Sequence, residues 1–423
     1  MTSRATAAEI RRTLLDCLKK LGICEQQIYT LTTDNGSNVD KAGKLMQEDA
    51  HNDETSDTEV DSPSQNIHEL SEELRSVTVA AKSVTPMRCA VHTLELCVHD
   101  VMNTNEHIKK LLVKVRKIVK KTHTQNIRLM FRQSGAALPK LDCETRWGST
   151  FNMLQSVMGC KSFLQQLGLA NDSLLLEEEE WACIDDLLVS LKPLHATTVA
   201  IQLRDLTAGE FLCEWLKCKV KLSKAGNGTT STAFFQAMED REANILNNSA
   251  FLSAVYMDPR FQCLLSEPQK QVAKAHLTAL WRRLLTMRMD NAASMETDCE
   301  EGNQPWSGTE SGTSNLVDKA DVESDDSIID NLLNQSDSKA RTRAVTNMSE
   351  ASLAIGGFDN TPRVDRNENL FHWWHCHPNN DLKSLAEIVI ALPVTQASVE
   401  RTFCGLHYIW SERRSSWKAD INY

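Results

Sequence analysis

Asp34 and Glu400 are separated by most of the chain, yet each stands where a metal-binding carboxylate can stand. Asp34 follows a β-like run, residues 28–33, and precedes the turn-forming NGSN, so a strand end would fix a side chain that the turn leaves accessible. Glu400 lies in the helix-like segment QASVERTF. Two-metal phosphoryl transfer needs several such acids from separate elements. An Asx turn at Asp34 and a solvated helix position at Glu400 are the non-catalytic alternatives.

Cys89 and His92 are one helical turn apart and could supply half of a metal site. A structural zinc site needs four ligands, and the other candidates lie in the HWWHCH segment, residues 372–377. The two tryptophans in that segment make a packed helix end an equally good explanation.

Arg146 and Trp147 combine a guanidinium that can bind phosphate with a large ring that can stack on an unpaired base. Residues 106–132 predict one amphipathic helix with nine lysines and arginines, which could follow a phosphate backbone. The candidate DNA contacts on this helix are Lys114, Arg116, Lys117, Lys120 and Lys121. The alternatives are a tryptophan buried in the core and an ordinary solvated helix face.

Charge is unevenly distributed among the elements that must position these residues. The chain has 423 residues and a net charge of −11. Residues 46–75 hold ten acidic residues and one basic residue, and residues 290–340 hold thirteen and two. The rest of the chain is therefore mildly basic. The negative charge of the whole chain does not exclude a nucleic-acid surface on this part.

Several classes of protein are disfavoured by the composition. No run of about 18 apolar residues could span a membrane, and the N-terminus has no apolar signal-peptide core. The 13 cysteines are scattered without a CxxC pair, which favours a reduced intracellular protein over a disulfide framework.

The periodicity indicates helices over residues 5–21 and 88–101 and through most of residues 151–288. We predict four regions from this pattern. They are residues 1–150 with an acidic loop at about 46–75, an all-helical domain over 151–288, an acidic disordered segment over 289–350, and a folded C-terminal region over 366–417.

Taken in order, several blocks resemble the hAT superfamily of DNA transposases and the host proteins domesticated from them. The blocks are TTDNGSN, CAVHTLEL, ETRWGSTFNML, EEEEWACIDDLLVSLKPLHATT, YMDPRFQ and LKSLAEIVIALPVTQASVERTF. The resemblance implies an α/β fold in which an RNase H-like core is interrupted by a large all-α insertion, so that the protein is helix-rich overall.

The resemblance also implies roles for single residues. The family's catalytic triad of two aspartates and one glutamate binds two divalent ions, and its second aspartate and its glutamate correspond to Asp34 and Glu400. Cys89 and His92 correspond to a pair near the active site, and Trp147 to a residue that handles a flipped base. The expected dimerisation residues are Trp373, Trp374, Leu382, Leu385, Ile388, Val389, Leu392 and Phe403.

The chain also departs from the family. Asp16 is the only aspartate before Asp34, and it lies in the predicted first helix. We therefore expect the first strands, the first triad aspartate and the N-terminal BED zinc finger to be missing. The expectation that follows is a nuclear, transposase-derived protein that is not an enzyme and needs no cofactor, with Mg²⁺ or Mn²⁺ required only by an intact active site.

The expected partner is a second copy or a related hAT-derived protein, with DNA possible and no membrane. One alternative is a fragment of an active DNA transposase whose N-terminus is missing from the sequence. Another is a nucleic-acid-binding module that uses residues 109–132 and Trp147 without catalysis.

Overall fold

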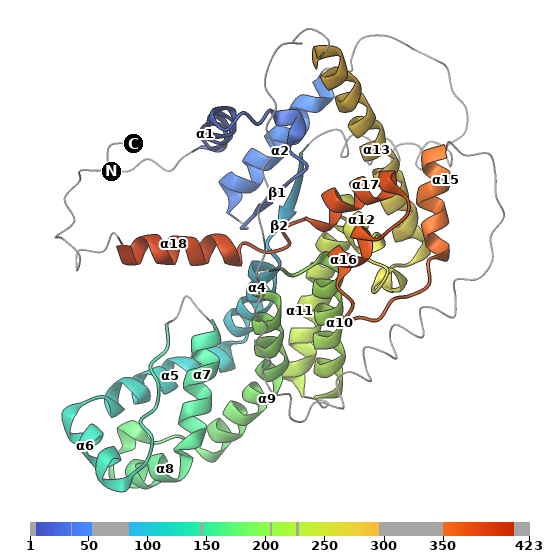
Figure 1. Cartoon of the computed structure of the whole chain (residues 1–423). Helices are drawn as coiled ribbons and strands as arrows, with labels where there is room; N and C mark the ends of the chain where they lie inside the picture. The colour runs from blue at the N-terminus through green and yellow to red at the C-terminus, as the bar shows by residue number, and fades with distance from the viewer. Residues whose placement is uncertain are drawn as a thin grey trace, which may run out of the picture. The chain divides into compact units, whose positions relative to one another are not determined.

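The computed structural model describes residues 6–34, 36–52, 84–143, 147–203, 205–225, 228–295 and 350–409 (Figure 1). These residues are mostly helical and contain one small two-stranded parallel sheet. They form two compact units, each assembled from three separate parts of the chain. Unit 1 contains Met1–Leu31, Lys41–Pro86 and Asn248–Leu392, and unit 2 contains Thr32–Asp40, Met87–Asn247 and Pro393–Tyr423.

The sheet consists of β1 (Thr30–Thr33) and β2 (Thr85–Arg88). The Thr85 N–H donates to the Tyr29 carbonyl at 3.0 Å, and the Cys89 N–H donates to the Thr33 carbonyl at 2.8 Å. Both partners advance by four residues along the chain, which is the register of a parallel pair. β1 confirms the strand predicted before Asp34.

The structure differs from the sequence analysis at two places. Residues 46–52 were expected to begin an acidic loop, but α2 (Ser37–Asn52) continues through them because Ala42 and Met46 are buried and hold this helix in place. β2 was not predicted, because Pro86 lacks an N–H donor and weakens the strand signal in the short sequence TPMR. The rest of the expected loop, from residue 53, lies outside the described residues.

Unit 1 is built around α12, whose eight side chains are all buried. This helix packs against α13 and α17. The helices of unit 1 are α1 (Ala7–Lys20), α12 (Ser249–Tyr256), α13 (Glu267–Met295), α15 (Glu350–Gly357), α16 (Leu370–His375) and α17 (Asn380–Ile390). α1 confirms the predicted N-terminal helix, and its Thr6 and Glu9 form a reciprocal capping box. The predicted disordered segment lies mostly outside the described residues.

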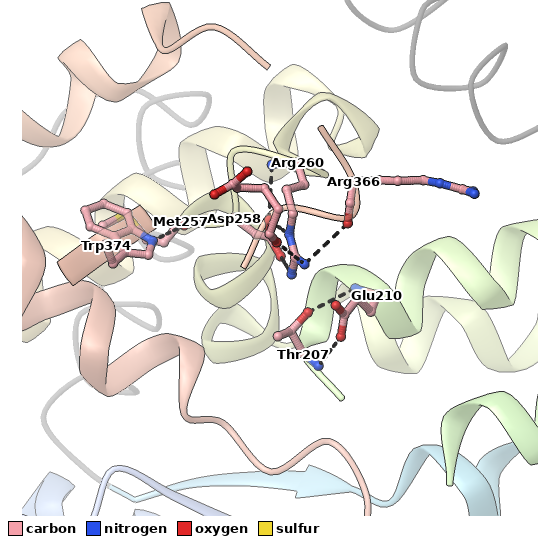
Figure 2. A network of polar contacts seen from close by, with 8 residues as sticks. Thr207, Glu210, Met257, Asp258, Arg260, Arg366 and Trp374 are labelled. Carbon is pink, nitrogen blue, oxygen red and sulfur yellow. Dashed lines mark hydrogen bonds and ion pairs between the residues drawn. The ribbon is translucent and has the colours of Figure 1, made fainter. Parts of the chain in front are cut away.

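Unit 2 is a helical assembly in which α9 packs against α4, α7, α10 and α11. Its helices are α4 (Ala90–Thr104), α5 (Glu106–Thr122), α6 (Gln125–Ser134), α7 (Trp147–Gly159), α8 (Lys161–Ala170), α9 (Glu178–Ile201), α10 (Ala208–Lys224), α11 (Thr229–Leu246) and α18 (Ala397–Ile409). Trp181, Trp215, Phe211 and Phe234 are among its largest fully buried side chains. A capping box between Thr207 and Glu210 begins α10 (Figure 2).

The helix predicted over residues 106–132 is two helices. α5 ends at Thr122, and α6 begins at Gln125 after an extended Thr124. The hydroxyls of Thr122 and Thr124 donate to the carbonyls of Val119 and Lys121. Such side-chain bonds compete with helix continuation, which explains the break. Among the described residues, no helix has the length and apolar character of a membrane span.

Candidate functional site

Both strands of the sheet end beside the loop that joins α17 to α18. Within unit 2, the Thr32 hydroxyl donates to the Pro393 carbonyl, and the Gln396 side-chain amide donates to the Thr32 carbonyl at 2.8 Å. The Ala90 N–H donates to the Val394 carbonyl at 2.9 Å. Three parts of the sequence that predicted chemistry therefore meet at one place.

Cys89 lies at the centre of this meeting point and is buried at the N-terminus of α4. Burial raises the pKa of its thiol, while hydrogen bonds from the N–H groups of His92, Gln396 and Val91 lower it and the nearby charge of Glu400 raises it. The Gln396 N–H lies 3.3 Å from the sulfur. The thiol is thus protonated at neutral pH and helps to hold the loop to the strand ends.

Asp34 and Glu400 both border this cluster. Asp34 is exposed and accepts a hydrogen bond from the Gly36 N–H at 3.2 Å, which is the geometry of an Asx turn. Glu400 is exposed in the first turn of α18, within electrostatic reach of Cys89. His92 pairs with Glu95 at 3.4 Å.

The described residues do not form a complete site for a divalent ion. Within the part of the chain that the structure describes, no three His, Cys, Asp or Glu side chains are grouped so that they could hold a metal. The four-ligand zinc site considered from Cys89, His92 and residues 372–377 is therefore not assembled among these residues. The catalytic roles of Asp34 and Glu400 stay predictions.

Trp147 is a core residue. It is buried, and its ring meets the ring of His195 edge-on, with centroids 6.0 Å apart. Phe151 stacks on the same imidazole at 4.5 Å, and burial lowers the pKa of His195. A flipped base could stack on Trp147 only after this packing opened. Arg146 lies outside the described residues, so the predicted pair is not visible together.

The predicted DNA contacts on α5 divide into two groups. Lys114 pairs with Glu180 at 2.5 Å, and the Arg116 Nε donates to Asp142 at 2.8 Å. The side chains of Lys114 and Arg116 therefore form ion pairs within unit 2. The exposed lysines of α5 are Lys109, Lys110, Lys117, Lys120 and Lys121.

Most of the predicted dimerisation residues are buried within the chain. Leu382, Leu385, Val389, Leu392 and Trp374 are buried, and Trp373 and Ile388 are half-buried. The Trp374 indole N–H donates to the Met257 carbonyl at 2.9 Å in unit 1 (Figure 2). Phe403 alone of the eight is exposed, by 64%.

Two residues that the sequence analysis did not single out, Gln396 and Arg260, each connect separate segments of the chain within one unit. Gln396 joins the loop to the strand ends, as described above. Arg260 is buried with Asp258 and donates to its carboxylate at 2.9 and 2.8 Å. It also donates to the carbonyl of Arg366 (Figure 2). The carbonyl of Glu368 accepts from the same guanidinium at 3.2 Å. The Asp and Arg two positions apart in YMDPRFQ carried the only local signal, an oppositely charged pair in a short segment that also holds aromatic and apolar residues.

Comparison with known proteins identifies two regions. Residues 87–189 match the ZBED1 RNase-like helical domain, and residues 358–422 match the hAT family C-terminal dimerisation region. The chain is also 24% identical over 226 residues to the human Zinc finger BED domain-containing protein 4. That alignment covers 50% of this chain and 19% of the relative, so the chain spans about a fifth of the relative's length. The resemblance stated from the sequence is confirmed in both regions.

Proposed function

We propose that this chain is a nuclear, transposase-derived protein that associates with a second copy of itself through the region of residues 358–422 and does not cut DNA. The match of this region to a dimerisation region carries the proposal. The β1–β2 sheet and the elements around it are, in this proposal, part of an RNase H-like core that a helical insertion interrupts. The expected partner is a second copy or a related hAT-derived chain.

The contacts between copies are assigned to the exposed apolar side chains of the region. The apolar stripe of α17 is covered by its own chain. Phe371, Val399 and Phe403 in contrast are exposed. Large aromatic side chains are enriched in the centres of protein interfaces, where they become fully desolvated. Phe403 therefore replaces the α17 leucines as the leading candidate for an intermolecular contact.

Light scattering on the purified chain over a range of concentrations tests the self-association. We expect a dimer that dissociates on dilution, and we expect Phe403→Ser to weaken it at least about tenfold, as loss of an aromatic contact worth 1.4 kcal/mol or more would do. Leu169→Ser is the matched control, because Leu169 is 87% exposed and lies outside the region. A monomer at all concentrations would refute the proposal. An equal effect of both variants would refute the role of Phe403.

The non-catalytic part of the proposal rests on the two acids that correspond to the triad. The carboxylate of Asp34 is engaged by its own turn, and Glu400 is an exposed acid in the first turn of α18. A nicking assay on supercoiled DNA with Mg²⁺ or Mn²⁺ is expected to show no cleavage above background. Metal-dependent nicking that disappears in Asp34→Asn would overturn this part and support the transposase alternative.

A second candidate function, nucleic-acid binding, is favoured by the exposed lysines of α5. Lys109, Lys110 and Lys117 line a shallow groove of about 330 Å³ together with Val113. Phosphate contacts give binding that weakens steeply as salt rises. We expect Lys117→Glu to lower both the affinity for duplex DNA and its salt dependence, by about one unit of slope. Lys192→Glu, at an exposed lysine of α9, is the control. Equal loss in both variants would show only a dependence on net charge.

A further inference from the structure

We infer that His372 and Cys376 form half of a zinc site, which a second copy of the chain completes with its own histidine and cysteine. This inference rests on the proposed self-association, because the pair lies inside the region of residues 358–422. The complete site would hold one zinc ion between two copies through two thiolates and two imidazoles.

The first observation is the separation of the two donor atoms. The Cys376 sulfur lies 3.8 Å from the His372 Nε2. With Zn–S near 2.3 Å and Zn–N near 2.0–2.1 Å, two ligands of one tetrahedral zinc lie about 3.6 Å apart. The pair therefore already has the spacing of two ligands on one ion. Its separation by four residues in the sequence places both side chains on one side of the helix.

The second observation is the support beneath the pair. Leu370 and Trp374 are buried and hold α16 against unit 1, with the Trp374 indole bonded to the Met257 carbonyl. His372 and Cys376 each follow a buried residue by two positions, which is a rotation of about 200° around a helix. Both are exposed as a result. A firmly anchored helix thus presents the two ligands to solvent.

The third observation concerns the neighbouring histidines. Lys383 donates to the carbonyl of His375 and lies 3.4 Å from its Nδ1. His377 accepts the Asn379 N–H and packs against the Trp374 ring. Neither histidine joins the pair in a three-ligand group among the described residues. One chain therefore offers two ligands.

A second copy is the natural source of the remaining two ligands. A two-fold interface brings the same surface of each copy together, so one histidine and one cysteine become two of each. Cys₂His₂ is a common ligand set for a structural zinc ion.

Metal binding and mass can be measured on the same sample. The full-length chain is reduced, stripped with EDTA and dialysed, and then titrated with Co²⁺ as a spectroscopic substitute for zinc. We expect a thiolate-to-cobalt charge-transfer band that saturates at one ion per two chains. Light scattering is then expected to show that Zn²⁺ lowers the dimer dissociation constant at least tenfold relative to EDTA.

Variants identify the ligands. Cys376→Ser and His372→Ala are each expected to abolish the one-to-two stoichiometry and the effect of zinc on mass. Cys17→Ser is the control, because Cys17 is an exposed cysteine on α1. A thiol-to-imidazole hydrogen bond alone would give no charge-transfer band, and that result would overturn the inference. Saturation at one ion per chain, or an unchanged band in Cys376→Ser, would overturn it as well.

The two proposals fail in different ways. A dimer in EDTA that zinc does not strengthen leaves the proposed self-association standing and refutes the shared zinc site. A monomer both in EDTA and in zinc refutes both. A monomer in EDTA that becomes a dimer in zinc supports the shared site and assigns the association to the metal.

Discussion

Replacing Arg260 with methionine is expected to destabilise unit 1 strongly. Arg260 is 4% exposed and Asp258 is 1% exposed. The guanidinium makes two hydrogen bonds to the Asp258 carboxylate and donates to the Arg366 carbonyl (Figure 2). It also donates to the Glu368 carbonyl. Methionine fills much of the same volume but leaves a buried carboxylate without its cation.

The magnitude follows from this geometry. Removing one partner of a buried ion pair costs about 3–5 kcal/mol, because the other charge stays desolvated. Loss of the 3.2 Å bond to the Glu368 carbonyl places the expected value in the upper part of that range. For a unit of this size, a change of 1 kcal/mol moves the melting temperature by about 2–4 °C, so a cost of about 4–5 kcal/mol should lower it by roughly 8–20 °C.

Thermal and urea unfolding of the full chain, followed by circular dichroism, would measure the loss. The double variant Asp258→Asn with Arg260→Met tests the cause, because asparagine carries no charge and can still accept the Arg260 backbone N–H, which lies 3.1 Å from Oδ1 in the wild type. We expect the double variant to recover at least about 2 kcal/mol of the loss. A cost below 1 kcal/mol for the single variant, or no recovery in the double variant, would refute the reasoning.

Three further predictions test other parts of the structure. Burial raises the pKa of the Cys97 and Cys218 thiols to about 12. Mass spectrometry after brief alkylation at pH 8 should therefore find these two cysteines unmodified and the exposed Cys143 modified. Early modification of Cys97 would contradict its burial. Burial lowers the pKa of His195, so the unfolded chain binds more protons and the stability should fall as the pH drops below about 6.5. Urea unfolding should show a smaller loss of stability between pH 7.5 and pH 5.5 in His195→Gln than in the wild type. An equal loss in the two proteins would contradict this. Thr207→Ala removes one side of the α10 capping box and should cost about 0.5–2 kcal/mol in urea unfolding, whereas Thr207→Ser should cost much less.

Local periodicity was enough to place the helices whose one face is apolar. Ile108, Leu111, Leu112, Val115 and Ile118 recur at helical spacing, and all five are buried in α5. The strand before Asp34 was also predictable, since its β-branched residues run directly into a turn signal. In these segments, propensity and tertiary packing favour the same structure.

The elements that escaped prediction depend on partners distant in sequence. β2 forms against β1 despite Pro86, and Gln396 acts only because residues more than 300 positions away lie beside it. A short stretch of sequence does not contain these long-range contacts. For this reason local periodicity could predict neither β2 nor the role of Gln396.

The C-terminal region shows that an apolar stripe chosen by family resemblance can be covered by its own chain. A stripe such as Leu382, Leu385 and Val389 indicates that one helix face must be covered, but its spacing carries no information about which surface covers it. In this chain α12 and α13 pack against α17, so the stripe contributes to folding. Substituting Leu385 would then abolish dimerisation by unfolding unit 1. Loss of the dimer in such a variant would therefore not distinguish a residue of the core from a residue of the interface. Phe403, His372 and Cys376 are the informative positions, because they are exposed and their loss should change association without changing the melting temperature of the monomer, measured in EDTA at concentrations where no dimer forms.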